Sequence, residues 1–254
     1  MTGSLAVVGL GPGDPELLTP EAATALAASD ALYGYGPYLD RVPARAGQTR
    51  YASDNREEGA RAAAALTHAG QGARVAVVSG GDPGVFAMAA AVCEQIERGD
   101  AAWRQLDLSV VPGVTAMLAV AAKVGAPLGH DFCAISLSDN LKPWDLVERR
   151  LSAAAGAGFV IALYNPISRA RPWQLGKAFE RLRGILPATT PVVFGRAVSR
   201  TDESVAVSTL DSADPSRADM ATLIIVGSAA TRVIERPGLL PLVYTPRSAD
   251  GPGA

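Results

Sequence analysis

The chain has 254 residues, of which 48% are apolar and 19% are charged, so disorder along the whole chain is excluded. Lys plus Arg (23) and Asp plus Glu (25) nearly balance, and the formal net charge is −2. Proteins that bind nucleic acids usually carry a basic excess that neutralises phosphates, so nucleic acid is not an expected partner.

Cysteine and histidine are too few for a disulfide framework or a metal site. The two cysteines are Cys93 and Cys133, and the two histidines, His68 and His130, lie far apart in the sequence. The first basic residue is Arg41 and no run of 18 apolar residues occurs, so neither a signal peptide nor a membrane span is predicted. We therefore expect a soluble, cytoplasmic protein.

In the first half of the chain, short apolar runs alternate with alanine-rich segments. The runs are typical of buried strands, while Thr19-Pro20 and the pair Asp54 and Glu57 are typical of helix starts. Strands are predicted at residues 5–8, 74–78 and 106–111, and helices from Pro20, from Asp54 to Ala69, at 85–97 and at 114–124.

The second half repeats this order, except that no helix separates its last two strands. Strands are predicted at residues 132–137, 159–164, 191–195, 204–210 and 222–226, and helices at 143–155 and 173–186. The alternation predicts an α/β protein with a mainly parallel N-terminal sheet, and the last two strands predict a mixed C-terminal sheet. The glycines and prolines of 112–129 suggest a division into domains 1–112 and 113–246, followed by a flexible tail, 247–254.

The first glycine-rich turn, Gly9-Leu-Gly-Pro-Gly-Asp-Pro15, differs from a dinucleotide-binding loop. Asp14 occupies the position of the third glycine, and its charge would repel a pyrophosphate. Pro12 and Pro15 prevent a helix from starting directly after the strand. A nicotinamide cofactor is therefore the weakest of the interpretations we consider.

Three more such turns, Ser79-Gly-Gly-Asp-Pro-Gly84, Pro112-Gly-Val-Thr-Ala116 and Tyr164-Asn-Pro166, follow apolar strands. Ligands of open α/β sheets bind at the carboxyl ends of strands, and bare backbone lets a ligand approach closely. Because Asp82 is acidic and the turns carry no basic side chain, they suit a ligand with positive charge. S-adenosylmethionine (SAM), with its sulfonium and ammonium groups, fits this chemistry, whereas ATP does not.

Three motifs, at residues 8–20, 79–86 and 111–116, resemble in order and spacing the signatures of the tetrapyrrole (corrin/porphyrin) methyltransferases. The resemblance extends to about residue 234. Segments 34–38, 137–144 and 162–166 are similar to the members that methylate C17 of precorrin-3B, a cobalamin precursor. The resemblance implies two α/β domains with SAM in the cleft between them, a precorrin-3B substrate and a homodimer.

Carried over position by position, the resemblance also implies the residues of the site. The expected cofactor contacts are Gly11, Pro12, Gly80, Gly81, Asp82, Val85, Phe86, Thr115, Ala116, Tyr164, Asn165, Ala197, Thr222 and Leu223. The expected substrate contacts are Tyr38, Ser136, Arg196 and Arg200, because arginines attract the many carboxylates of a tetrapyrrole. No metal is expected in the protein.

The resemblance implies that methylation of C17 is accompanied by contraction of the tetrapyrrole ring. This contraction needs a base that removes a hydroxyl proton of the substrate. The candidate bases are Tyr35, Asp82, Asp139, Tyr164 or a carboxylate of the substrate. Related uroporphyrinogen methyltransferases have an aspartate where this chain has Tyr35, so no acid–base role carries over from them to that position. The sequence does not choose among these groups.

Purely structural interpretations compete with the functional ones. Asp82 and Thr115 are also suited to capping the helices that follow them, and Arg196 and Arg200 to a solvated surface. Trp144 and Trp173 are more typical of packing than of substrate contact. At the level of function, the alternatives are the same methylation of a cobalt-containing intermediate and a binding protein without catalysis.

Overall fold

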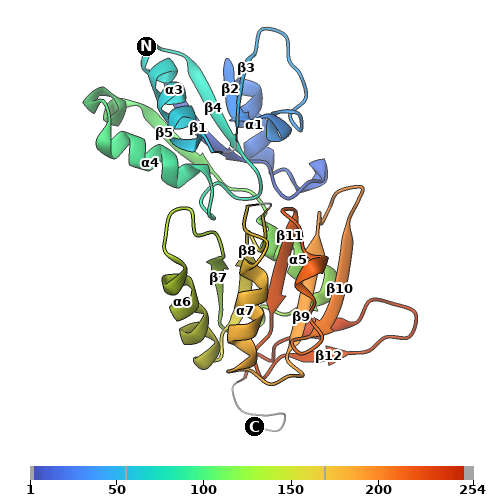
Figure 1. Ribbon diagram of the computed structural model, residues 1–254. Coiled ribbons are helices and arrows are strands. Elements are labelled where there is room, and N and C mark those ends of the chain that lie inside the picture. The colour runs from blue at the N-terminus through green and yellow to red at the C-terminus, as the bar shows by residue number, and fades with distance from the viewer. Residues whose placement is uncertain (1–2, 55, 169, 249–254) are drawn as a thin grey trace. The chain divides into compact units, whose positions relative to one another are not determined.

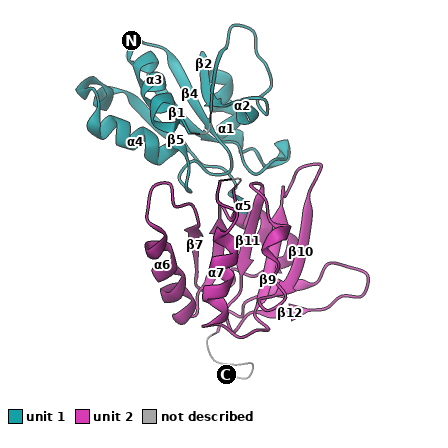
Figure 2. Cartoon of the chain, viewed as in Figure 1, with its two compact units in different colours: residues 1–116 teal, residues 117–254 magenta. Residues whose placement is uncertain are grey.

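In a computed structural model, which describes residues 3–54, 56–168 and 170–248, the chain divides into two units, Met1–Ala116 and Met117–Ala254 (Figure 2). Each unit is an α/β layer structure with its own sheet and its own core, as the sequence predicts. Of the predicted tail, 247–254, residues 249–254 lie outside the described residues. None of the described helices is long and apolar enough to cross a membrane.

Unit 1 contains a five-stranded sheet in which every pair of neighbouring strands is parallel (Figure 1). Its strands are β1 (Ser4–Gly9), β2 (Ala31–Tyr35), β3 (Thr49–Ser53), β4 (Arg74–Ser79) and β5 (Asp107–Val111), in the order β3-β2-β4-β1-β5. The predicted strands and their parallel pairing are confirmed. β2 and β3 were not predicted, because β2 is short and interrupted by Gly34 and β3 is largely exposed at the edge of the sheet.

Helices cover both faces of this sheet. They are the 3-10 helices η1 (Pro15–Leu17) and η2 (Ala101–Gln105) and the α-helices α1 (Pro20–Ala28), α2 (Gly36–Leu39), α3 (Glu58–Gly70) and α4 (Met88–Arg98). α1 and α2 pack on one face around Val8 and Leu32, and α3 and α4 pack on the other around Leu5 and Val7. Burial on both faces explains why the central strands are continuous apolar runs rather than alternating ones.

The start of α1 is confirmed, whereas two other predicted helix starts are wrong. The Thr19 hydroxyl accepts a hydrogen bond from Ala22 N at 3.1 Å, as an N-cap does. α3 begins at Glu58 rather than at Asp54, and Asp54 N donates to Glu57 Oε2 at 3.0 Å just before it. α4 begins at Met88, three residues later than predicted, because Phe86 has a φ of 52° and residue 87 is extended.

Unit 2 contains a mixed five-stranded sheet and a small three-stranded one. The strands are β7 (Phe132–Ser136), β8 (Val160–Tyr164), β9 (Pro191–Arg196), β10 (Ser204–Thr209) and β11 (Thr222–Val226), in the order β10-β9-β11-β8-β7, and β6 (Gly125–Ala126), β12 (Arg232–Ile234) and β13 (Leu242–Tyr244). Only β7 and β8 pair in parallel within the large sheet. The predicted mixed sheet is therefore confirmed, and the short strands of the small sheet were not predicted.

The helices of unit 2 lie on both faces of the large sheet. They are α5 (Ala116–Val124), α6 (Trp144–Gly156), α7 (Gln174–Arg183) and the 3-10 helix η3 (Pro215–Arg217). α6 and α7 bury Leu151 and Phe179 against one face. On the other face, Val120 of α5 packs so closely on Gly195 of β9 that a Cβ there would overlap its methyl groups. Helix α5 starts two residues later than the predicted 114–124, and α7 starts one residue later and ends three residues earlier than the predicted 173–186.

Candidate functional site

The glycine-rich turns of unit 1 meet at the edge formed by the carboxyl ends of its parallel strands. Gly11 N donates to Gly81 O at 3.1 Å and Gly81 N donates to Gly11 O at 2.9 Å, so the turns after β1 and β4 form an isolated antiparallel bridge. Both glycines have a φ of +66°, a conformation that L side chains rarely adopt. The structure therefore brings together the first two turns that the sequence singled out.

Close packing of backbone on backbone explains two more glycines. A Cβ on Gly9 would lie 2.7 Å from Gly81 O and 2.8 Å from Gly113 N. A Cβ on Gly113 would likewise overlap Gly81 O. The ends of β1, β4 and β5 thus approach within backbone contact, and no larger residue fits at either position.

The carboxylate of Asp82 ties two of these turns together. Its Oδ1 accepts from Gly84 N at 2.8 Å, and its Oδ2 accepts from Gly113 N at 3.1 Å. The side chain therefore holds the turn after β4 against the turn after β5, and it does not cap a helix. Thr115, which is buried, and Ala116 border Gly81: a Cβ on Gly81 would lie 3.7 Å from Thr115 Cα and 3.9 Å from Ala116 N.

Two tyrosines cover this edge from the side of β2. The rings of Tyr35 and Tyr38 are 5.4 Å apart and nearly perpendicular. Tyr38 also packs directly on Gly80, where a Cβ would lie 2.7 Å from Tyr38 Cζ. A predicted substrate residue and a predicted cofactor residue are thus in contact.

The sequence did not indicate a role for Arg41, whose side chain binds the backbone of the first glycine-rich turn. Its Nη2 donates to Leu10 O at 2.7 Å and to Gly11 O at 2.9 Å. A lone arginine 30 residues downstream carries no local signal for such a contact, so only the tertiary structure reveals it.

In unit 2 the predicted residues also gather at one sheet edge. β7, β8 and β9 run in one direction and β11 runs in the other, so the start of β11 lies beside the ends of the other three. In the register, Ser136 pairs with Tyr164 and Thr222 pairs with Arg196. The predicted residues at this edge are Ser136, Tyr164, Asn165, Arg196, Ala197, Thr222 and Leu223.

Hydrogen bonds fix the strand ends that carry these residues. Asn165 Nδ2 donates to Ser136 Oγ at 2.9 Å, which joins the ends of β7 and β8. The Tyr164 hydroxyl accepts from Met117 N, in the first turn of α5, at 3.1 Å. This hydrogen bond holds the phenol ring of Tyr164 against the start of α5.

Arg196 is an ion-pair partner within unit 2. Its Nε lies 2.7 Å from Asp219 Oδ2 and its Nη1 lies 2.9 Å from Asp202 Oδ2. The two carboxylates raise the pKa of Arg196, Asp219 more than Asp202. Partial burial opposes ionisation of Asp219, yet hydrogen bonds from Thr222 and Arg196 leave its pKa below the ordinary value. Arg200 is exposed, and its backbone N donates to Ala197 O at 2.9 Å.

Three of the predicted cofactor residues have left-handed backbone although they are not glycine. Phe86, Asn165 and Ala197 have φ angles of 52°, 51° and 47°. Such residues cost roughly 1–3 kcal/mol each and are concentrated at ligand sites, where the surrounding structure holds them. They lie just after β4, β8 and β9, at the edges described above.

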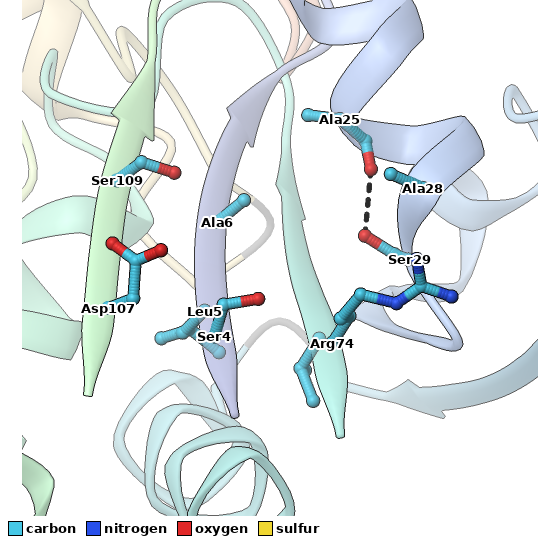
Figure 3. A pocket seen from close by; sticks show the side chains of 10 residues that line it. Ser4, Leu5, Ala6, Ala25, Ala28, Ser29, Arg74, Asp107 and Ser109 are labelled. Atoms are coloured by element: carbon cyan, nitrogen blue, oxygen red, sulfur yellow. Dashed lines mark hydrogen bonds between the residues drawn. The ribbon is translucent and has the colours of Figure 1, made fainter. Parts of the chain in front are cut away.

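A shallow depression of about 200 Å³ lies at the opposite, amino-terminal edge of the sheet of unit 1 (Figure 3). It is lined mostly by alanine and serine, together with Leu5, Val75, Arg74 and Asp107. Arg74 already pairs with Asp30 at 2.6 Å. None of the predicted site residues borders this depression, so it does not compete with the glycine-rich edge.

The model of the Tetrapyrrole (Corrin/Porphyrin) Methylases matches residues 4–214 of the chain. The chain belongs to this family. Members relate to it over the full length: a Sinorhizobium protein named precorrin-3B C(17)-methyltransferase is 66% identical over 99% of both chains. A Salmonella typhimurium protein named probable cobalt-factor III C(17)-methyltransferase is 40% identical, over 95% of this chain and 99% of its own.

Two solved structures of this methylase family extend the comparison to the fold. The crystal structure of the methyltransferase CobJ has a TM-score of 0.92 and 48% identity, covering 96% of this chain and 100% of its own. Uroporphyrin-III C-methyl transferase from Thermus thermophilus, complexed with S-adenyl homocysteine, has a TM-score of 0.66 and 25% identity, covering 89% of this chain and 98% of its own. The predicted family and α/β fold are confirmed.

Proposed function

We propose that this tetrapyrrole methylase transfers a methyl group from SAM to C17 of precorrin-3B and contracts the ring to give precorrin-4. The observation that carries the proposal is the 66% identity to the Sinorhizobium precorrin-3B C(17)-methyltransferase over 99% of both chains. As in that kind of enzyme, the reaction belongs to cobalamin biosynthesis.

The residues present suit SAM as the methyl donor. The edge of unit 1 offers bare backbone at Gly80 and Gly81 and the fixed carboxylate of Asp82, without a basic side chain in the turns. These groups match the positive charges of SAM, whose sulfonium supplies an electrophilic methyl group. The contacts we propose are Gly11, Pro12, Gly80, Gly81, Asp82, Val85, Phe86, Thr115, Ala116, Tyr164, Asn165, Ala197, Thr222 and Leu223.

The main work of these residues is alignment. Methyl transfer from a sulfonium is a direct displacement, so nucleophile, methyl carbon and leaving sulfur have to lie in line. The bridged glycine turns and the hydrogen-bonded strand ends hold this backbone in one arrangement. Two of the candidate bases already accept backbone hydrogen bonds: Tyr164 from Met117 N, and Asp82 from Gly84 N and Gly113 N.

The assembly and location follow from the family resemblance as further parts of this proposal. We expect a homodimer in the cytoplasm, with domains 1–112 and 113–246 and substrate contacts from Tyr38, Ser136, Arg196 and Arg200.

The second candidate is the same methylation of a cobalt-containing intermediate. The observation that favours it is the 40% identity to the Salmonella cobalt-factor III protein, again over nearly the full chain. The lower identity places this candidate behind precorrin-3B. Cobalt would enter inside the substrate, so protein ligands do not distinguish the two.

Incubation of the purified protein with SAM and a panel of tetrapyrroles, with and without cobalt, tests the proposal. We expect mass spectrometry to detect a product heavier by one methyl group from precorrin-3B, together with S-adenosylhomocysteine. Turnover of the cobalt-containing compound alone would favour the second candidate. Stoichiometric binding of SAM with no methylation of any tetrapyrrole would indicate a binding protein instead.

A further inference from the structure

The loops that follow β7 and β8 are joined by a series of contacts, starting at the backbone. Leu137 N donates to Tyr164 O at 2.9 Å, directly after the last paired residues of the two strands. The Ser136 hydroxyl accepts from Asn165 Nδ2 and from Ser138 N, at 2.9 and 3.3 Å. The two loops therefore leave the sheet as a hydrogen-bonded pair.

Further from the sheet, three polar side chains continue the connection. Gln174 is 2% exposed, and its Nε2 donates to Leu137 O at 2.8 Å and to Asp139 Oδ1 at 3.0 Å. The same Asp139 oxygen lies 2.5 Å from Arg171 Nε. We call Asp139, Arg171 and Gln174 the loop clamp, because they bind the loop after β7 to the loop before α7.

An aromatic pair closes the far ends of the same loops. The rings of Trp144, at the start of α6, and Trp173, just before α7, are 4.8 Å apart and nearly perpendicular. Edge-to-face pairs of this kind are attractive beyond the area that they bury. Backbone, clamp and aromatic contacts thus hold the two loops in one arrangement.

We propose that the loop clamp positions the tetrapyrrole contacts of the neighbouring strand ends and that Asp139 is a positioning residue rather than the proton acceptor. The proposal rests on the proposed function. Asp139 Oδ1 is committed to both donors, so moving the carboxylate toward a substrate would break two hydrogen bonds, one of them from a buried amide. A proton on Asp139 would also remove the charge that holds Arg171. The clamp instead holds Leu137, the residue next to the proposed substrate contact Ser136.

Steady-state kinetics of Asp139→Asn, Arg171→Gln and the double variant test this assignment in the full-length protein with precorrin-3B and SAM. For a half-buried pair we expect each single variant to raise KM for the tetrapyrrole about ten-fold, with little change in kcat or in KM for SAM. The double variant should be no worse than the worse single one, since both remove the same contact. Arg171→Lys should restore part of the loss.

The pH profile separates positioning from catalysis. If Asp139 only positions, the acidic limb of kcat/KM remains in Asp139→Asn. Loss of that limb together with a fall in kcat of a hundred-fold or more, while Arg171→Gln stays active, would make Asp139 the base and overturn the proposal. Wild-type kinetics in all three variants would also overturn it.

Asp145→Asn is the matched control, because Asp145 pairs with Arg149 on the exposed surface of the neighbouring α6. It should leave both KM values unchanged. The stability of the wild type, of Asp139→Asn, of Arg171→Gln and of the double variant is measured in urea without substrate. We expect the losses of stability in the two single variants to be non-additive, whatever the substrate is. If the wild-type protein methylates no tetrapyrrole, the proposed function fails, and the substrate role of the loop clamp fails with it. Additive losses of stability in the double variant would instead disprove the loop clamp itself, whatever the substrate is.

Discussion

Single residues at the two sheet edges adopt conformations that the chain would avoid elsewhere. Gly81 has a positive φ, and so do Phe86, Asn165 and Ala197, which pay for it in backbone strain. Reciprocal hydrogen bonds and backbone packing hold them in place. At the scale of single residues, the candidate site depends on glycines that leave the backbone bare and on charged side chains that are already held in ion pairs.

Replacement of Gly81 by leucine should weaken SAM binding about ten-fold or more, a loss of at least about 1.4 kcal/mol. The side chain would start in a left-handed backbone and extend toward Thr115 and Ala116, where we place the ligand. Calorimetric titration with SAM measures the effect.

Gly158→Leu is the control for backbone strain alone. Gly158 also has a positive φ, of +80°, and a Cβ there would meet no atom within 4 Å. We expect both variants to lose stability in urea, by about 1–2 kcal/mol for the left-handed backbone, and only Gly81→Leu to lose affinity. Equal affinities in the two variants would remove the turn after β4 from the site.

Arg196→Ala should raise KM for the tetrapyrrole by a few-fold and leave the affinity for SAM nearly unchanged. The side chain of Arg196 is 37% exposed, so a carboxylate contact is screened by solvent and contributes far less than a shielded pair would. The salt dependence of KM should be weaker in the variant than in wild type.

Asp202→Asn breaks one ion pair of Arg196 and retains the guanidinium, so it should leave KM unchanged. If it reproduces the effect of Arg196→Ala, the arginine acts by holding the end of β9 and does not touch the substrate. A collapse of SAM binding in Arg196→Ala would assign this strand end to the cofactor.

Elements are joined by a few specific pairs as well as by the two cores. Asp30, the residue before β2, accepts hydrogen bonds from Arg74 at the start of β4, from Nη2 at 2.6 Å and from N and Nε at 3.1 Å. α5 and β9 meet where Val120 covers Gly195. The pair of Asp30 and Arg74 is electrostatic and exposed, so it should respond to pH and salt. The contact of Val120 with Gly195 is steric and buried, so it should respond to changes in side-chain volume.

The stabilising effect of Asp30 should depend on pH. The side-chain hydrogen bond from Arg74, with its backbone hydrogen bond, lowers the pKa of Asp30 to about 2. A lowered carboxyl pKa stabilises the folded state above the unfolded value of about 3.9, and this contribution is lost as the pH falls toward 2. Urea unfolding of wild type and Asp30→Asn should differ by a constant amount from pH 7 to 5, and by less below pH 4.

High salt provides the check on that interpretation, because the pair is exposed and screened. The difference between wild type and Asp30→Asn should shrink in high salt at pH 7. A difference that grows as the pH falls would contradict the sign of the pKa shift.

Gly195→Ala should destabilise unit 2 by about 1–3 kcal/mol, because the added methyl group overpacks the contact of β9 with α5. A Cβ there would overlap Val120 Cγ2 and lie 2.7 Å from Val120 Cγ1. The double variant with Val120→Ala should be less destabilised than the sum of the two single ones, as urea unfolding can measure. Additive effects would show that the helix moves away instead.

As a whole molecule, the protein combines a slightly negative charge with a proposed substrate that bears many carboxylates. Local arginines have to offset this repulsion at the site. Among the described residues, no group of three or more His, Cys, Asp or Glu side chains is arranged to hold a metal ion. Direct displacement at a sulfonium methyl group requires alignment rather than a Lewis acid.

Methyl transfer should therefore be insensitive to chelation. Activity with precorrin-3B is measured before and after dialysis against EDTA, and again after addition of zinc. Equal rates are expected in all three samples. A loss on dialysis that zinc reverses would show a metal site that neither the sequence nor the described side chains indicate.

Local patterns in the sequence determined much of this protein. Continuous apolar runs predicted the central strands of both sheets, and glycine-rich turns directly after them indicated a ligand site at strand ends, while the individual site residues came from the family resemblance and stay a prediction. These signals are readable because each is contained in a few consecutive residues. The turns after β1, β4 and β5 also carried the family signature, so the methyltransferase assignment did not depend on the coordinates.

Tertiary structure alone decided which side chains are partners. Arg41 supports a turn 30 residues away, Arg196 pairs with Asp219, and Arg171 with Gln174 binds Asp139 across two loops. The exposed edge strand β3 likewise depends on its pairing with β2. Such contacts form when the folded sheets bring strand ends together, and no local spacing in the sequence encodes them. For this reason the sequence left several possible roles open for Asp82, Asp139 and the arginines.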